Sequence, residues 1–149
     1  MNLNKKYLDV FLCSLTVGLL WFCYALYLKF TISQNKEPIV GFGYLIMLSY
    51  IILIIFFSMK GLLLGTVSFC GTITIFFFLC LLLAIYKKTQ LSFVDFIIAQ
   101  LKLPYCPITF FSGSSAGLVT TFFKKKRLSV FIGVGLFVVL TIGNFLLEK

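Results

Sequence analysis

The sequence predicts an all-α protein: a polytopic integral membrane helical bundle with four or five transmembrane helices, formed by residues 1–149 as a single transmembrane domain. The chain is 61% hydrophobic and 11% charged, whereas soluble domains average about 45–50% apolar and about 25% charged residues. Its apolar residues also form runs near the ~20 residues that a helix needs to cross a bilayer. Such spans leave no segment for a separate soluble domain.

The first predicted span covers residues 8–28. Lys5 and Lys6 precede it, as basic residues precede the apolar region of a signal peptide. That region is only about 7–15 residues long in signal peptides, and no small-x-small cleavage site follows the run here. We therefore expect a helix that is retained.

Aromatic residues recur at steps of three near the end of this span, at Trp21, Tyr24 and Tyr27, and Lys29 follows them. Aromatic rings and a snorkelling lysine are typical of the membrane interface. A packing stripe inside the bundle is the competing interpretation. The lysine favours the interface.

Residues 40–86 form one apolar run with a single charge, Lys60. The run is too long for one span and about right for two. A lysine at the bilayer centre would cost about 2.5–3.5 kcal/mol, so we expect Lys60 and Gly61 to form a tight turn at a membrane face. The predicted spans on either side are residues 39–59 and 62–86.

After this run the chain becomes more polar. Residues 91–102 are apolar apart from a narrow face with Asp95 and Lys102, which predicts a helix lying in the interface. Two prolines follow, and residues 108–123 then regain apolar character while carrying six Ser and Thr hydroxyl groups. The final predicted span covers residues 128–147.

The segment 104–123 decides between the two topologies. If the segment crosses the membrane, there are five spans. With the N-terminus in the cytoplasm, seven Lys and Arg residues then lie on the cytoplasmic side and six on the other side. If it does not cross, the best arrangement puts nine inside and four outside, which the positive-inside rule prefers. The apolar content of residues 87–127 favours five spans, because such a loop would not remain in water. A re-entrant hairpin is also compatible.

Each of these topologies places the basic cluster in the cytoplasm, at the level of the anionic lipid headgroups. The cluster consists of Lys124, Lys125, Lys126 and Arg127.

Residues 113–117 read GSSAG and match the G-x-S-x-G pattern of serine hydrolases. A serine nucleophile needs a base, and the sequence has no histidine. The nearby lysines at headgroup level stay protonated, so a Ser–Lys dyad at Ser115 is a weak alternative. The five cysteines form no C-x-x-C pair, so we expect no metal site and no cofactor.

The same segment is better interpreted as a packing surface. Glycines and other small residues spaced by four let helix backbones approach closely, and Ser or Thr can hydrogen-bond across the contact. We therefore expect the segment to pack against protein, either its own helices or another subunit. The predicted helix-packing residues are Gly61, Gly65, Ser112, Gly113, Ala116 and Gly117. Residues predicted for a polar pathway or polar packing are Thr109, Ser114, Ser115, Thr120 and Thr121.

The function expected from these patterns is non-enzymatic. We expect a subunit or accessory factor of a larger membrane complex, in the plasma or inner membrane, that contacts the bilayer, anionic headgroups and another membrane protein or a second copy. The alternative is a small oligomeric channel or transporter with a Ser/Thr/Gly-lined pathway at residues 109–121. The net charge of +9 fits residues that flank spans, and we expect no nucleic-acid binding.

Overall fold

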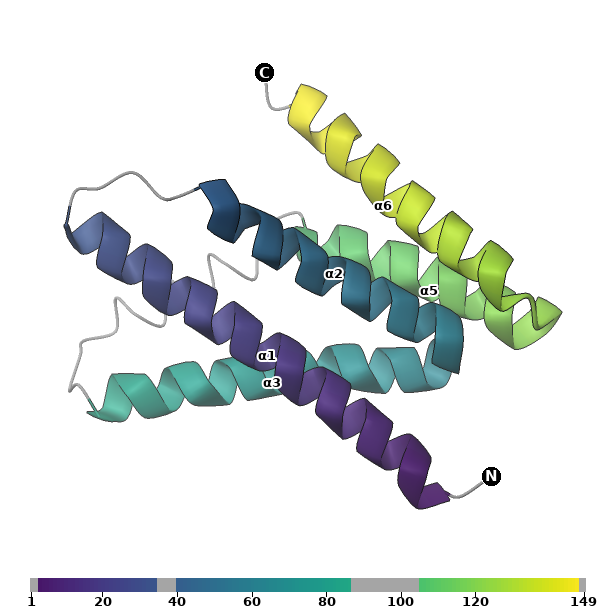
Figure 1. Ribbon diagram of the computed structural model, residues 1–149, viewed down its shortest axis with the longest axis horizontal. Coiled ribbons are helices and arrows are strands. Elements are labelled where there is room, and N and C mark those ends of the chain that lie inside the picture. Colours follow the sequence, from purple (N-terminus) through teal and green to yellow (C-terminus); the bar gives the residue numbers. More distant parts are fainter. Residues whose placement is uncertain (1–2, 35–39, 87–104, 148–149) are drawn as a thin grey trace.

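The computed structural model describes residues 3–34, 40–86 and 105–147. All the regular structure in these ranges is helical, and it forms a five-helix bundle (Figure 1). The helices overlap the predicted spans, although the first one is longer at both ends than residues 8–28. The predicted interfacial helix, residues 91–102, lies outside the described residues. The helices are α1 (Leu3–Ser33), α2 (Val40–Lys60), α3 (Leu62–Tyr86), α5 (Tyr105–Phe123) and α6 (Lys126–Leu147).

The helices alternate in direction across the bundle. The start of α1, the α2–α3 turn and the α5–α6 connection all lie at one end, at the right of Figure 1, and α6 leads away from that end to the top of the picture. Helix α2 packs against all four other helices, and α5 packs against α2, α3 and α6. Helix α1 packs mainly on α3. Residues 105–123 are therefore an integral part of the bundle.

The α2–α3 connection is a tight turn at Gly61, where the sequence predicts it. Gly61 has a φ of +86°, a conformation that glycine adopts without the penalty of a Cβ. Its N–H donates to the Phe57 carbonyl at 2.8 Å, which closes α2, and its carbonyl accepts from Gly65 at 3.0 Å, which opens α3. Gly61 thus acts through its backbone conformation rather than as a residue within a helix.

An aromatic cluster fills the bundle around Trp21. The Trp21 side chain is 5% exposed, and its Nε1–H donates to Ser49 Oγ at 2.8 Å. Its ring centroid lies 5.2 Å from that of Tyr50 and 6.0 Å from that of Phe76. This ring faces α2 and α3, in agreement with the competing packing interpretation, and the level of Trp21 in the membrane stays a prediction. Tyr24, Tyr27 and Lys29 are half-buried.

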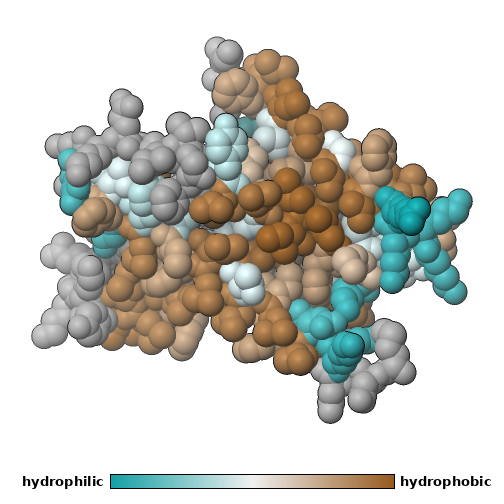
Figure 2. Space-filling view, in the orientation of Figure 1, coloured by the Kyte–Doolittle hydropathy of each residue, from teal (hydrophilic) through white to brown (hydrophobic). Residues whose placement is uncertain are grey.

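Apolar side chains cover most of the visible surface, and the larger groups of hydrophilic residues lie at the right, with smaller ones at the left (Figure 2). Three helical segments in the described ranges are long and apolar enough to cross a membrane, and a fourth is shorter. By length and composition these helices indicate a multi-pass integral membrane protein. The three are Lys5–Thr31, Leu62–Leu83 and Lys126–Leu147, and the shorter one is Tyr44–Lys60.

Candidate functional site

Helix α5 turns its smallest side chains into the bundle. The buried residues recur three or four positions apart, as in 109, 112 and 116 or 109, 113 and 117, so they share one face of the helix. Four of the six predicted packing residues lie on this face, which meets α2, α3 and α6. The packing partner is the chain itself, one of the two options that the sequence leaves open. The buried residues of α5 are Cys106, Thr109, Ser112, Gly113, Ala116 and Gly117.

One phenyl ring links three helices at this face. Phe57 of α2 is fully buried, and its two edges face glycines of different helices. A Cβ added at Gly65 of α3 would overlap Phe57 Cδ1, and a Cβ added at Gly113 of α5 would lie 2.7 Å from Cδ2. The ring occupies the space that both glycines leave open, so α2, α3 and α5 are held in one register.

The end of α5 lies directly on the α2–α3 turn. A Cβ at Gly117 would lie 2.8 Å from the Leu62 Cα atom and 2.9 Å from its N atom. The Leu62 N–H donates to Thr121 Oγ1 at 3.3 Å, and Thr120 Oγ1 donates to the Ser58 carbonyl at 2.5 Å. The two backbones approach at Gly117 to a distance that only glycine permits, and the two threonine hydroxyls bond across the same contact.

Helix α6 docks on α5 through Gly133, a residue that the sequence analysis did not select. A Cβ at Gly133 would lie 2.7 Å from both Ala116 Cβ and Ile54 Cγ2. One turn earlier, Ser129 Oγ donates to the Ala116 carbonyl at 2.5 Å. The sequence signal is the spacing of four in Ser129, Gly133 and Phe137, which are the buried residues of α6.

The hydroxyl groups of α5 lie in different surroundings. Thr109 and Ser112 are fully buried, and in the described part of the chain their oxygens have no hydrogen-bond partner. The same is true of the Ser114 oxygen. Ser115 is only half-buried and donates to its own helix, to the Phe111 carbonyl at 2.9 Å. The predicted pathway residues therefore do not share one surface.

Ser115 also lacks the setting of a nucleophile. In serine hydrolases the G-x-S-x-G serine stands on a sharp strand-to-helix turn, whereas Ser115 lies in the middle of the continuous helix α5. Lys124 follows the end of that helix and is exposed. The two residues are nine positions apart, which corresponds to about 13 Å along a helix at about 1.5 Å of rise per residue.

The basic residues of three helix ends meet at the same end of the bundle. The predicted headgroup cluster, Lys124 to Arg127, is exposed there, together with Lys5 at the start of α1. Lys60 at the end of α2 forms an ion pair with Asp9 of α1, with Nζ and Oδ2 2.5 Å apart. Asp9 is the only carboxylate side chain in residues 3–34, 40–86 and 105–147, so this end is strongly positive.

Comparisons with protein-family models, with curated proteins and with solved structures give no match for this chain. Two features of the bundle can be related to function by their geometry. One is the set of helical glycines, most of which another helix covers. The other is the positive end, where the ion pair between Asp9 and Lys60 joins α1 to α2.

Proposed function

We propose that this chain is a small, non-catalytic, multi-pass membrane protein that serves as a subunit or accessory factor of a larger membrane complex. The observation that carries the proposal is a difference among its glycines. A Cβ at six helical glycines would lie within 3 Å of a neighbouring helix, whereas Gly135 and Gly143 of α6 have nothing within 4 Å. The six covered glycines are Gly18, Gly65, Gly71, Gly113, Gly117 and Gly133.

A glycine within a helix lowers the stability of that helix, and an uncovered glycine makes no close contact in this chain that would offset the loss. Glycine is about 0.8–1.0 kcal/mol less favourable than alanine in a helix interior. Close helix packing offsets that cost at Gly113 and Gly117, and nothing in the described structure offsets it at Gly135 and Gly143. Close approach of a helix from another chain would supply the missing contact.

These two glycines belong to an outward-facing stripe that we call the outer face of α6: Phe131, Gly135, Val139 and Gly143. Residues four apart lie above one another on a helix. Phe131 is 79% exposed and Val139 is 65% exposed, so the stripe combines large apolar side chains with open backbone. That combination suits an apolar helix of another membrane protein, and it offers no polar group for catalysis.

The alternative function, a channel with a pathway along residues 109–121, has less support. Thr109 and Ser112 are fully buried, and the ring of Phe57 lies against Gly113 on the same face. A pathway there would require α5 to leave its neighbours. A pore between several copies of the chain would instead use a surface such as the outer face of α6, which the experiment below tests.

The arrangement of the helices favours five crossings with the N-terminus in the cytoplasm. Helix α5 packs beside α2 and α6, which supports a crossing by this segment as well. The start of α1, the α2–α3 turn and the α5–α6 connection then share the cytoplasmic side (Figure 1). Reporter fusions at the N-terminus and at residue 125 should report the cytoplasm, and a fusion at the C-terminus should report the opposite side. A C-terminal fusion in the cytoplasm would contradict five crossings.

The accessory role is tested by photo-crosslinking from the outer face of α6 in native membranes. A photoreactive residue at Val139 should give a discrete adduct with a different chain, and one at Phe78 of α3, which is 56% exposed, should not. Gly135→Leu should lower the Val139 adduct about tenfold, because overpacking costs on the order of 1–3 kcal/mol and about 1.4 kcal/mol is tenfold in affinity. An absent adduct, or equal yields from both positions, would refute the proposal. An adduct with a second copy would support the pore alternative.

A further inference from the structure

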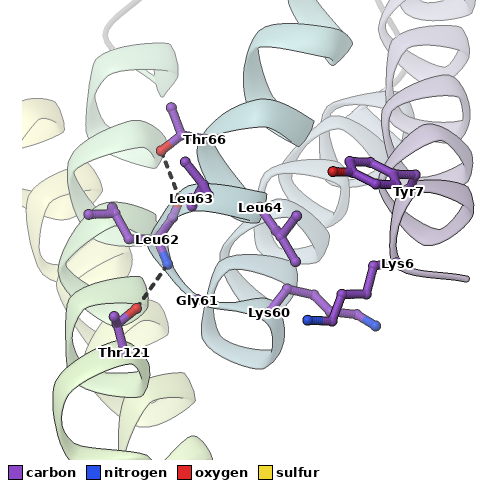
Figure 3. Close-up of a pocket in the computed structure, with 9 residues that line it drawn as sticks. All are labelled: Lys6, Tyr7, Lys60, Gly61, Leu62, Leu63, Leu64, Thr66 and Thr121. Carbon is purple, nitrogen blue, oxygen red and sulfur yellow. Dashed lines mark hydrogen bonds between the residues drawn. The ribbon is translucent and has the colours of Figure 1, made fainter. Parts of the chain in front are cut away.

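A cavity of about 650 Å³ opens between the start of α1 and the α2–α3 turn (Figure 3). Its volume lies within the ~300–1,000 Å³ of small-ligand sites. The side chains of Lys6 and Lys60 extend toward each other across one part of it, while Tyr7 and Leu64 form another wall (Figure 3). The cavity therefore has a cationic part and an apolar part. The remaining lining residues are Gly61, Leu62, Leu63, Thr66 and Thr121.

We infer that this cavity binds one anionic phospholipid. Its phosphate would lie between the ammonium groups of Lys6 and Lys60, and an acyl chain would follow Leu63 and Leu64 along α3. The proposal is independent of the accessory role, because it rests on a charged cavity at the α2–α3 turn and not on the apolar outer face of α6.

The ion pair with Asp9 positions the Lys60 ammonium group and leaves some of its N–H donors available. An ammonium group has three N–H donors, and one of them is directed at Asp9 Oδ2 at 2.5 Å. The side chains are 26% and 32% exposed, so the remaining donors of Lys60 are open to a ligand. Lys6 adds a second ammonium group, and since Asp9 is the only carboxylate in the described residues, the cavity keeps a net positive charge.

The apolar wall favours a lipid over a free anion. Leu63 is 78% exposed at the first turn of a helix that is apolar enough to cross the membrane. A lipid whose headgroup lies at the level of Lys6 and Lys60 can extend its chains in the same direction as α3. Inorganic phosphate would contact the lysines alone and gain nothing from Leu63 and Leu64. The first N–H groups of α3 add a partial positive charge at the same place.

The test uses the full chain in nanodiscs of phosphatidylcholine with a minor fraction of phosphatidylglycerol, followed by native mass spectrometry of the retained lipid. The wild-type chain should retain one phosphatidylglycerol in preference to phosphatidylcholine. Lys6→Gln should reduce that retention about fivefold, since a lysine near an anionic headgroup contributes about 1 kcal/mol. Lys6→Gln also leaves the pair of Lys60 with Asp9 in place, so the fold is not disturbed.

The matched control is Lys5→Gln, which removes the same charge from the neighbouring, exposed residue that does not line the cavity. It should retain phosphatidylglycerol as the wild type does, and added inorganic phosphate should not displace the lipid. Equal loss in Lys5→Gln and Lys6→Gln would reduce the effect to general surface charge and overturn the site. Equal retention by wild type and Lys6→Gln, or displacement by inorganic phosphate, would overturn the proposal as well.

Discussion

Helices α5 and α6 are neighbours of similar composition, and they use glycine in different ways. In α5 both glycines lie on the buried face, against the ring of Phe57 and the backbone of Leu62. In α6 one glycine, Gly133, is covered by α5 and α2, whereas Gly135 and Gly143 face open space. The same residue type therefore serves the fold of this chain in one helix and is left free for a lateral contact in the other.

The two helices also differ in how much of their surface the chain covers. The buried residues of α5 extend from Cys106 to Gly117, over most of its length. Those of α6 stop at Phe137, and the helix then diverges from the bundle toward the C-terminus (Figure 1). Helix α6 is thus the element with the most surface left for a lipid or a partner.

The largest effect should come from a side chain placed at the closest backbone contact. Gly117→Leu should destabilise the bundle by about 3 kcal/mol, at the upper end of typical overpacking costs, because the Leu62 backbone cannot move as a side chain could. Unfolding by SDS titration in mixed micelles, followed by circular dichroism, measures this. Gly143→Leu is the matched control, and it should leave the unfolding midpoint unchanged or raise it slightly, since the new side chain meets no atom and leucine has the higher helix propensity. Equal midpoints for both variants would contradict the α5 packing described here.

A smaller difference in stability should distinguish substitutions on the buried face of α6 from substitutions on its outer face. Gly133→Ala should destabilise by about 1 kcal/mol, because the overlap with Ala116 and Ile54 exceeds the gain in helix propensity. Gly135→Ala should be neutral or stabilise by up to about 1 kcal/mol, since it gains the propensity and meets no atom. The same SDS titration compares the two variants. A reversed order would place α6 in another rotation about its axis.

The smallest effect should distinguish a bonded hydroxyl from an unbonded one. Ser129→Ala should cost about 0.6 kcal/mol, the average for an interhelical hydrogen bond in membranes, because it loses the bond to the Ala116 carbonyl. Ser112→Ala should be neutral or slightly stabilising, since its buried oxygen has no partner in the described structure. Unfolding free energies of both variants in one detergent mixture provide the measurement. A larger loss of unfolding free energy in Ser112→Ala than in Ser129→Ala would show that the Ser112 hydroxyl is hydrogen-bonded.

Much of this architecture follows from local properties of the sequence. Apolar run lengths predict the helices, and the lone charge at Lys60 followed by Gly61 predicts the turn between α2 and α3. Spacing by four predicts that Gly113 and Gly117 share a packing face. Each of these features depends on residues that are close together in the chain, so it can be predicted from the local sequence.

Other features depend on which helix faces which, and the sequence by itself did not determine them. Trp21 has the spacing of an interface residue, yet its ring lies inside the bundle because α2 presents Ser49 and Tyr50 to it. The contact of Phe57 with Gly113 and the ion pair of Asp9 with Lys60 each join residues more than fifty positions apart. Hydropathy and local spacing do not say which helix lies opposite a given face. Only the tertiary structure decided which glycines of this chain are covered and which remain open.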